Sequence, residues 1–267
     1  MLLLLAGVND RFPRSGPTRN GHLYYRHDFL PEDSRMKLAI VHDWLTGMRG
    51  GEKCLEVLCR RFPQAELFTL VHNPGAASDT IEAMRIRTSV LQRFPGATRH
   101  YRYLLPLMPW AIERLQIPED VDLVVSFSHA VDKSIQPPPG VPHLCYCFTP
   151  MRYAWHLRQE YFGEAEPAAK RKETALPETS VHSLRVRGPI ELARQLVLDR
   201  IRDWDRETSE RVTHFVASSH TVARRLAECY GRSCRVIYPP VDTEFFTPAA
   251  VPREDFYLCV SALVPYK

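Results

Sequence analysis

The sequence predicts an α/β fold in which a parallel sheet is covered by helices on both faces. Short apolar runs of strand length alternate along the chain with segments whose apolar residues recur at spacings of three and four. The first pattern is typical of buried strands and the second of amphipathic helices. Strands that alternate with helices favour parallel pairing, because each crossover helix packs on one face of the sheet.

The elements can be assigned in chain order. The predicted strands are Lys37–Val41, Glu66–Val71, Arg85–Thr88, Asp122–Phe127, His143–Phe148, His214–Ser218 and Arg235–Tyr238. The predicted helices are Glu52–Arg61, Tyr101–Leu115, Leu184–Arg211 and Thr221–Tyr230. Residues 163–182 have no hydrophobic period and are predicted to be a surface loop, with Lys170, Arg171 and Lys172 as a solvated charge run.

Three regions divide the chain. Residues 1–35 are largely polar and aperiodic, and Met36 stands immediately before the first strand. We expect residues 1–35 to be a disordered extension, or upstream sequence added by a misplaced start codon. Residues 36–248 are expected to form one domain, and residues 249–267 a linker and the first strand, Phe256–Ala262, of a second domain.

Composition restricts the compartment more than the function. A formal net charge of +4 over 267 residues suits anionic small molecules, a membrane surface or nucleic acid, and selects none of them. Nucleic acid is disfavoured, because the Lys and Arg residues are dispersed and no recognised nucleic-acid module is present. The seven cysteines lack the paired spacing of a disulfide scaffold or a zinc site, which favours a reducing cytoplasm and no metal.

The connection between the first strand and the first helix carries the most informative motif. It contains Gly50 and Gly51, with Arg49 and Lys53 beside them. Glycine allows a close backbone approach or a positive φ, and the first turn of a helix offers free N–H groups to an anion. The spacing matches neither the dinucleotide fingerprint nor the Walker motif. A phosphate-binding turn and an ordinary strand-to-helix turn therefore both remain open.

Two further unusual segments follow predicted strands. They are Ser126–His129 after the fourth strand and Thr149–His156 after the fifth. In open parallel sheets, ligands bind at the carboxyl ends of the strands. We therefore expect these two segments and the glycine turn to share one rim of the sheet.

Several motifs in this order resemble the N-terminal half of a retaining glycosyltransferase of family 4, which has the GT-B architecture of two Rossmann-like domains. The motifs are His42-Asp43-Trp44 with Gly50–Lys53, Phe127–His129, Cys147–Trp155, Ala217–Ala223, Tyr238–Asp242 and Val260–Lys267. The resemblance covers roughly residues 36–267. Within the family, the chain is most similar to mannosyltransferase-like enzymes that build bacterial surface polysaccharides.

The resemblance implies a role for each rim segment. Such enzymes hold the acceptor on the N-terminal domain and most of the nucleotide sugar, their co-substrate, on the C-terminal domain. His129 matches a histidine beside the transferred sugar and is the candidate catalytic residue; without the resemblance, a helix-start residue or a buried structural histidine is the alternative. The donor-diphosphate residues would be Gly50, Gly51 and Lys267. The acceptor side would comprise His42, Asp43, Arg152, Tyr153 and Trp155.

Two departures from the family pattern limit the expected activity. Ala262 stands where family members usually carry an arginine, and the C-terminal domain with its paired glutamates is absent. The 267 residues alone are therefore expected to be inactive or nearly so. The alternative function is a non-catalytic fragment that binds only an acceptor or a partner domain.

The segment Arg99–Leu115 mixes basic, aromatic and aliphatic residues. Such a composition suits a helix lying on anionic lipid, and it suits core packing equally well. Two prolines interrupt any long amphipathic face. The expected location is the cytoplasm, with contact at the inner face of the membrane left open.

Overall fold

The computed structural model describes residues 36–155, 189–248 and 255–260. Their centre is a seven-stranded, entirely parallel sheet with the order β3-β2-β1-β4-β5-β6-β7. The strands are β1 (Leu38–Leu45), β2 (Glu66–His72), β3 (Arg85–Thr88), β4 (Leu123–Ser128), β5 (His143–Cys147), β6 (His214–Ala217) and β7 (Arg235–Val236). The predicted fold class is confirmed.

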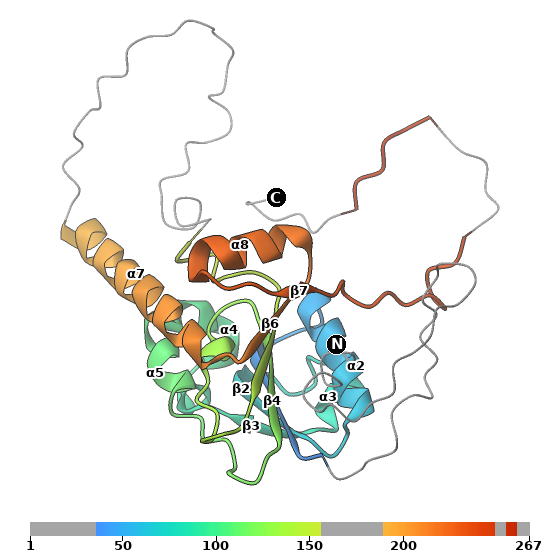
Figure 1. The fold of residues 1–267 in the computed structure, drawn as a ribbon, viewed down its shortest axis with the longest axis horizontal. Helices are drawn as coiled ribbons and strands as arrows, with labels where there is room; N and C mark the ends of the chain where they lie inside the picture. Colours follow the sequence, from blue (N-terminus) through green and yellow to red (C-terminus); the bar gives the residue numbers. More distant parts are fainter. Residues whose placement is uncertain (1–35, 156–188, 249–254, 261–267) are drawn as a thin grey trace, which may run out of the picture.

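The helical elements cover both faces of the sheet. The α-helices are α2 (Gly50–Arg61), α3 (Asp79–Glu82), α4 (Ala97–His100), α5 (Met108–Ile112), α7 (Pro189–Glu207) and α8 (His220–Tyr230). The 3₁₀ turns are η1 (Val90–Arg93), η2 (Tyr101–Leu107), η3 (Asp132–Ser134) and η5 (Thr208–Arg211). Figure 1 shows α2 and α3 on one side of the sheet and α4, α5 and α7 on the other.

The alternation of side chains along β1 explains the two layers. Leu38 and Ile40 pack in the core beneath α2 and α3, whereas Ala39 and Val41 pack in the core beneath α5 and α7. Successive residues of a strand face opposite sides of the sheet, so a strand covered on both faces is apolar throughout. A third cluster lies beneath α8 and contains both Cys145 and Cys147, as their spacing on one strand predicts.

The order of the strands changes direction between β1 and β4. β1 pairs with β2 on one edge and with β4 on the other, and His42 lies opposite Phe127 in the second pairing. In a doubly wound sheet such a reversal opens a crevice at the carboxyl ends of the two strands. The segments after β1, β4 and β5 therefore share one rim, as predicted.

Two predicted elements differ in the structure. The helix expected over Tyr101–Leu115 is instead η2 followed by α5, with Pro106 inside η2. Proline lacks the N–H that a continuous α-helix needs at that position. The strand expected over Phe256–Ala262 is wrong for the part that can be compared, because residues 255–260 form no strand. Side chains there, such as Tyr257 and Val260, are exposed, and no described strand lies beside them to supply a ladder partner.

Other predictions fall outside the described residues. These are the extension 1–35, the loop 163–182 with Lys170–Lys172, the linker at 249–254, Ala262 and Lys267. In the described part of the chain, no helix has the length and hydrophobicity needed to cross a membrane.

Candidate active site

The rim is built around the start of α2. Gly50 is the first residue of α2 and is exposed, and Gly51 follows it. Neither glycine has a positive φ, so no unusual backbone torsion requires glycine here. What the two glycines provide is room at the start of the helix, because they have no side chain. A Cβ on Gly51 would lie 3.4 Å from Cε2 of Phe148 and 3.5 Å from Cε1 of His42, whereas among the described residues a Cβ on Gly50 would meet nothing within 4 Å.

Glu52 and His42 lie directly beneath this helix start. The Glu52 carboxylate accepts a hydrogen bond from the Arg49 N–H at 3.1 Å, and its other oxygen lies 3.8 Å from Nε2 of His42. His42 Nδ1 donates to the Phe127 carbonyl at 3.0 Å. Burial acts to raise the pKa of Glu52, but His42, a backbone N–H and His129 together hold that pKa below its ordinary value. An ionised carboxylate therefore orders the turn at physiological pH.

Asp43 organises the segment that follows β4. Its two carboxylate oxygens accept hydrogen bonds from four consecutive backbone N–H groups, those of His129, Ala130, Val131 and Asp132, at 2.7 to 2.9 Å. Asp43 is fully buried, and its Oδ2 also lies 3.0 Å from Nδ1 of His129. One carboxylate thus fixes both the backbone of this turn and the imidazole at its start.

The contact with Asp43 determines which ring nitrogen of His129 carries the proton. A carboxylate accepts hydrogen bonds, so Nδ1 carries the proton and Nε2 keeps its lone pair. Burial lowers the pKa of His129 despite the opposing charges of Asp43 and Glu52, and His42 and Arg152 act in the same direction as burial. The imidazole is therefore neutral near pH 7. Its side chain is 21% exposed and lies 4.6 Å, ring centre to ring centre, from Trp44.

The loop after β5 holds the other predicted site residues. Arg152 and Tyr153 are partly buried, and the charge of Arg152 acts on His129. Burial raises the pKa of Tyr153, and the charge of Asp43 raises it further. Trp155 is turned into the protein, because its Nε1–H donates to Oδ2 of Asp205 at 2.7 Å.

The structure therefore brings together most of the residues singled out in the sequence. His42, Asp43, Gly51 and His129 form one cluster, and Arg152 acts electrostatically on His129. His42 and Asp43 are fully buried, so they are placed to orient other groups; contact with an acceptor stays a prediction for them. Lys267 lies outside the described residues.

Three residues of this region were not singled out in the sequence: Glu52, Lys133 and Asp205. Glu52 stands three positions after the residue that precedes α2, where a glutamate reaches back to cap a helix. Asp205 takes a place on the buried stripe of α7, after Leu198 and Ile201. A polar residue on an apolar stripe is the signal that could have identified it. Nothing comparable distinguishes Lys133.

Comparison with known proteins agrees with this geometry. The family model described as Glycosyltransferase Family 4 matches residues 48–245, well over half of the chain. The matched region includes Gly50, Gly51, His129 and the loop that ends at Trp155; His42 and Asp43 lie just before it. No curated protein matches the chain.

Proposed function

The chain belongs to glycosyltransferase family 4, and we propose that it transfers a hexose, with mannose as the first candidate, from a nucleotide sugar to a glycan or lipid-linked acceptor. The proposed reaction retains the anomeric configuration and serves surface polysaccharide synthesis. The observation that carries the proposal is the convergence of an open helix N-terminus and a neutral, oriented His129 on one rim of the sheet.

The start of α2 is the proposed site of the donor diphosphate. When the sugar leaves, negative charge grows on the nucleoside diphosphate, and preorganised N–H groups and cations lower the barrier. Gly50 and Gly51 supply first-turn N–H groups with no intrahelical acceptor, and Arg49 and Lys53 are exposed nearby. We propose Lys267 as a further cation. With this charge neutralised by the protein, no metal is required, and EDTA should leave the activity unchanged.

His129 is the proposed catalytic residue. Its Nε2 lone pair can accept a hydrogen bond from a hydroxyl of the transferred sugar, because Asp43 holds the proton on Nδ1. Asp43 and His42 would act through His129 and the turn that carries it. Arg152 and Tyr153 would face the acceptor.

A direct test is a screen of UDP- and GDP-sugars for binding and transfer, with the longest chain that the reading frame encodes. Gly50→Ala is the informative variant, because the added methyl meets no side chain or neighbouring element of the described residues within 4 Å. Donor binding should weaken severalfold while thermal stability stays equal or rises, since alanine favours a helix over glycine. Unchanged donor binding would show that the donor diphosphate does not bind at this turn.

The alternative function is a non-catalytic fragment that binds an acceptor or a partner domain. This alternative predicts acceptor binding without transfer from any nucleotide sugar, even in the longest chain. Transfer that depends on His129 would exclude it.

A membrane partner is favoured by the surface around η2. The sequence has no Asp or Glu between Glu82 and Glu113. Exposed apolar side chains lie on this stretch: Phe94, Tyr103, Leu107 and Trp110. An apolar groove of about 340 Å³ runs between η2 and α7, with Arg102 and Arg194 among its lining residues. Aromatic and basic residues together suit an anionic lipid surface.

Vesicle sedimentation tests this partner. The protein should sediment with vesicles that contain phosphatidylglycerol and remain in solution with phosphatidylcholine alone. Tyr103→Ser with Leu107→Ser should reduce sedimentation, whereas Val57→Ser, an exposed change on the opposite helix α2, should not. Equal sedimentation of all forms would place the contact elsewhere.

A further inference from the structure

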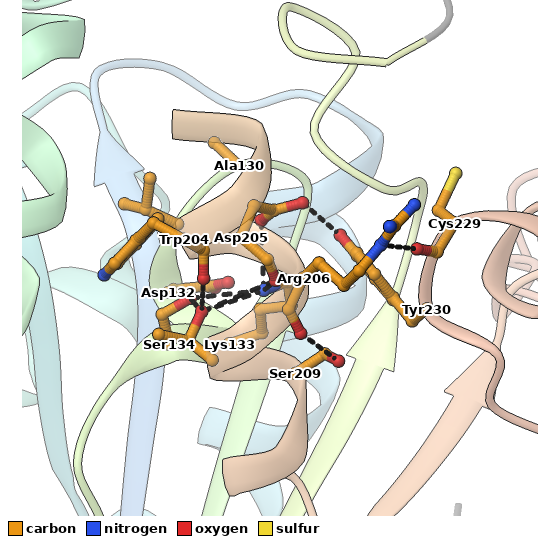
Figure 2. A network of polar contacts seen from close by, with 12 residues as sticks. Ala130, Asp132, Lys133, Ser134, Trp204, Asp205, Arg206, Ser209, Cys229 and Tyr230 are labelled. Carbon is orange, nitrogen blue, oxygen red and sulfur yellow. Dashed lines mark hydrogen bonds and ion pairs between the residues drawn. The ribbon is translucent and has the colours of Figure 1, made fainter. Parts of the chain in front are cut away.

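A buried ion pair lies next to the rim. Lys133 belongs to η3, four residues after His129, and Asp205 lies near the end of α7. Their side chains are 1% and 0% exposed, and Nζ lies 3.0 Å from Oδ1. Figure 2 shows the two side chains at the centre of a network that joins η3, α7 and α8. Neither residue has a role in the proposed function.

The remaining contacts of Lys133 are also internal. Its Nζ donates to the backbone carbonyl of Asp205 at 2.6 Å and to hydroxyls of Ser134 and Thr208 at 3.2 and 3.4 Å. It also lies 4.9 Å from the ring centre of Tyr230. A buried ammonium is tolerated only when such partners surround it. The position of the η3 turn relative to α7 is thereby fixed.

The second oxygen of Asp205 has two further donors. Nε1–H of Trp155 and the hydroxyl of Tyr230 each donate to Oδ2 at 2.7 Å. Trp155 lies at the end of the loop that carries Arg152 and Tyr153. One carboxylate therefore joins the acceptor-side loop, the turn that begins with His129, and α8.

We propose that Asp205 is a positioning residue for the acceptor. Its Oδ2 holds Trp155 and so the loop that carries Arg152 and Tyr153. Its Oδ1 holds Lys133, on the turn that begins with His129, so the loop keeps a fixed position relative to His129. The loop is anchored at its start by β5, where the Phe148 N–H donates to the Ser128 carbonyl at 2.8 Å. Asp205 supplies the anchor at its other end. This role rests on the proposed glycosyl transfer, since it concerns the acceptor of that reaction.

Two matched variants separate positioning from simple support of the fold. Trp155→Phe and Tyr230→Phe each remove one neutral donor to the same oxygen and keep an aromatic ring. Only the first releases the loop. The acceptor KM should rise about tenfold in Trp155→Phe, because the loop loses a hydrogen bond to a charged group. The donor KM should stay unchanged. Tyr230→Phe should leave both KM values within about twofold of wild type.

A double variant tests the same role from the other side of the contact. Lys133→Met with Asp205→Leu removes both charges, so no unpaired charge stays buried. It should raise the acceptor KM as much as Trp155→Phe does. An unchanged acceptor KM here would assign the effect of Trp155→Phe to a direct acceptor contact and would overturn the role of Asp205.

Amide hydrogen exchange provides a readout that needs no activity. Peptides covering residues 149–155 should exchange faster in Trp155→Phe and in the double variant, and as in wild type in Tyr230→Phe. If the wild-type protein transfers no sugar, the proposed function fails, and exchange still decides whether Asp205 anchors the loop. Equal exchange in all four proteins, or an equal rise in the acceptor KM for both Phe variants, would overturn the proposal.

Discussion

The two halves of the candidate site are held by different kinds of contact. At β1 and β4, the Asp43 carboxylate binds four backbone N–H groups in succession. After β5, Met151 and Ala154 of the loop pack in the core, and the indole of Trp155 reaches Asp205, fifty positions further along the chain. Backbone donors are present whatever the side chains are, whereas a side-chain anchor depends on single residues. The first half should therefore be rigid and the second adjustable.

Asp43→Asn should have the largest effect, and it addresses the rigid half. The amide keeps one oxygen but turns an NH₂ group toward donors, so buried N–H groups lose their acceptor. We expect a loss of about 3 kcal/mol or more in the free energy of unfolding, measured by urea denaturation. Asp203→Asn, at a carboxylate that is 67% exposed on α7, should change it by less than about 0.5 kcal/mol. Similar values for both variants would contradict a rigid β1/β4 half.

His129→Ala should come next, with its effect on turnover rather than on stability. Loss of a positioned imidazole typically costs about 100-fold or more in rate. The side chain is 21% exposed, so stability should fall by no more than about 1 kcal/mol. His100→Ala, at an exposed histidine before η2, should leave turnover unchanged. If His129→Ala turned over at close to the wild-type rate, His129 would have a structural role in the turn and no catalytic role.

The place of the rigid half on the rim was predictable from the sequence, whereas the bonds of Asp43 to four N–H groups and the anchor of the adjustable half were not. An apolar strand that runs into Gly50 and Gly51 is a local signal, and the parallel sheet then places His129 beside it. Asp205 stands in a helix that also carries Asp199 and Asp203. Only its place on the buried stripe of α7 separates it from these neighbours, and its partners lie on other elements. Pro106 marked an interruption of the predicted helix Tyr101–Leu115 in the sequence. Helix propensity did not predict that a 3₁₀ turn followed by a short α-helix would form there.

The pH dependence of Asp132 tests the turn where the two halves meet. Asp132 is fully buried, and burial together with the charge of Asp43 raises its pKa well above the ordinary value of 3.8. The folded state therefore keeps a proton that the unfolded chain has already lost. Stability falls as the pH rises above about 4, by about 1.4 kcal/mol for each unit until the raised pKa is reached.

Asp132→Asn removes this titration while keeping the shape of the side chain. Unfolding measured at pH 4 should differ little between Asp132→Asn and wild type. At pH 8 the variant should be more stable by about 1 kcal/mol or more, because it carries no carboxyl that the fold must keep protonated. A variant that is less stable than wild type at pH 8 would show that the carboxyl has partners that stabilise its ionised form.

Glu52→Gln should have the smallest effect, and its sign should be opposite. The pKa of Glu52 is lowered in the folded protein, so its ionised form contributes stability above the ordinary value of 4.5, and that contribution is lost as the pH falls through the folded value. Glutamine keeps an acceptor for the Arg49 N–H but loses the charge beside His42. The variant should be less stable than wild type by about 1 kcal/mol at pH 7. At pH 3 the difference should shrink. Two carboxyls within the same rigid half would then respond to pH in opposite directions, because Glu52 has His42 and a backbone N–H beside it, whereas Asp132 is fully buried with the charge of Asp43 nearby.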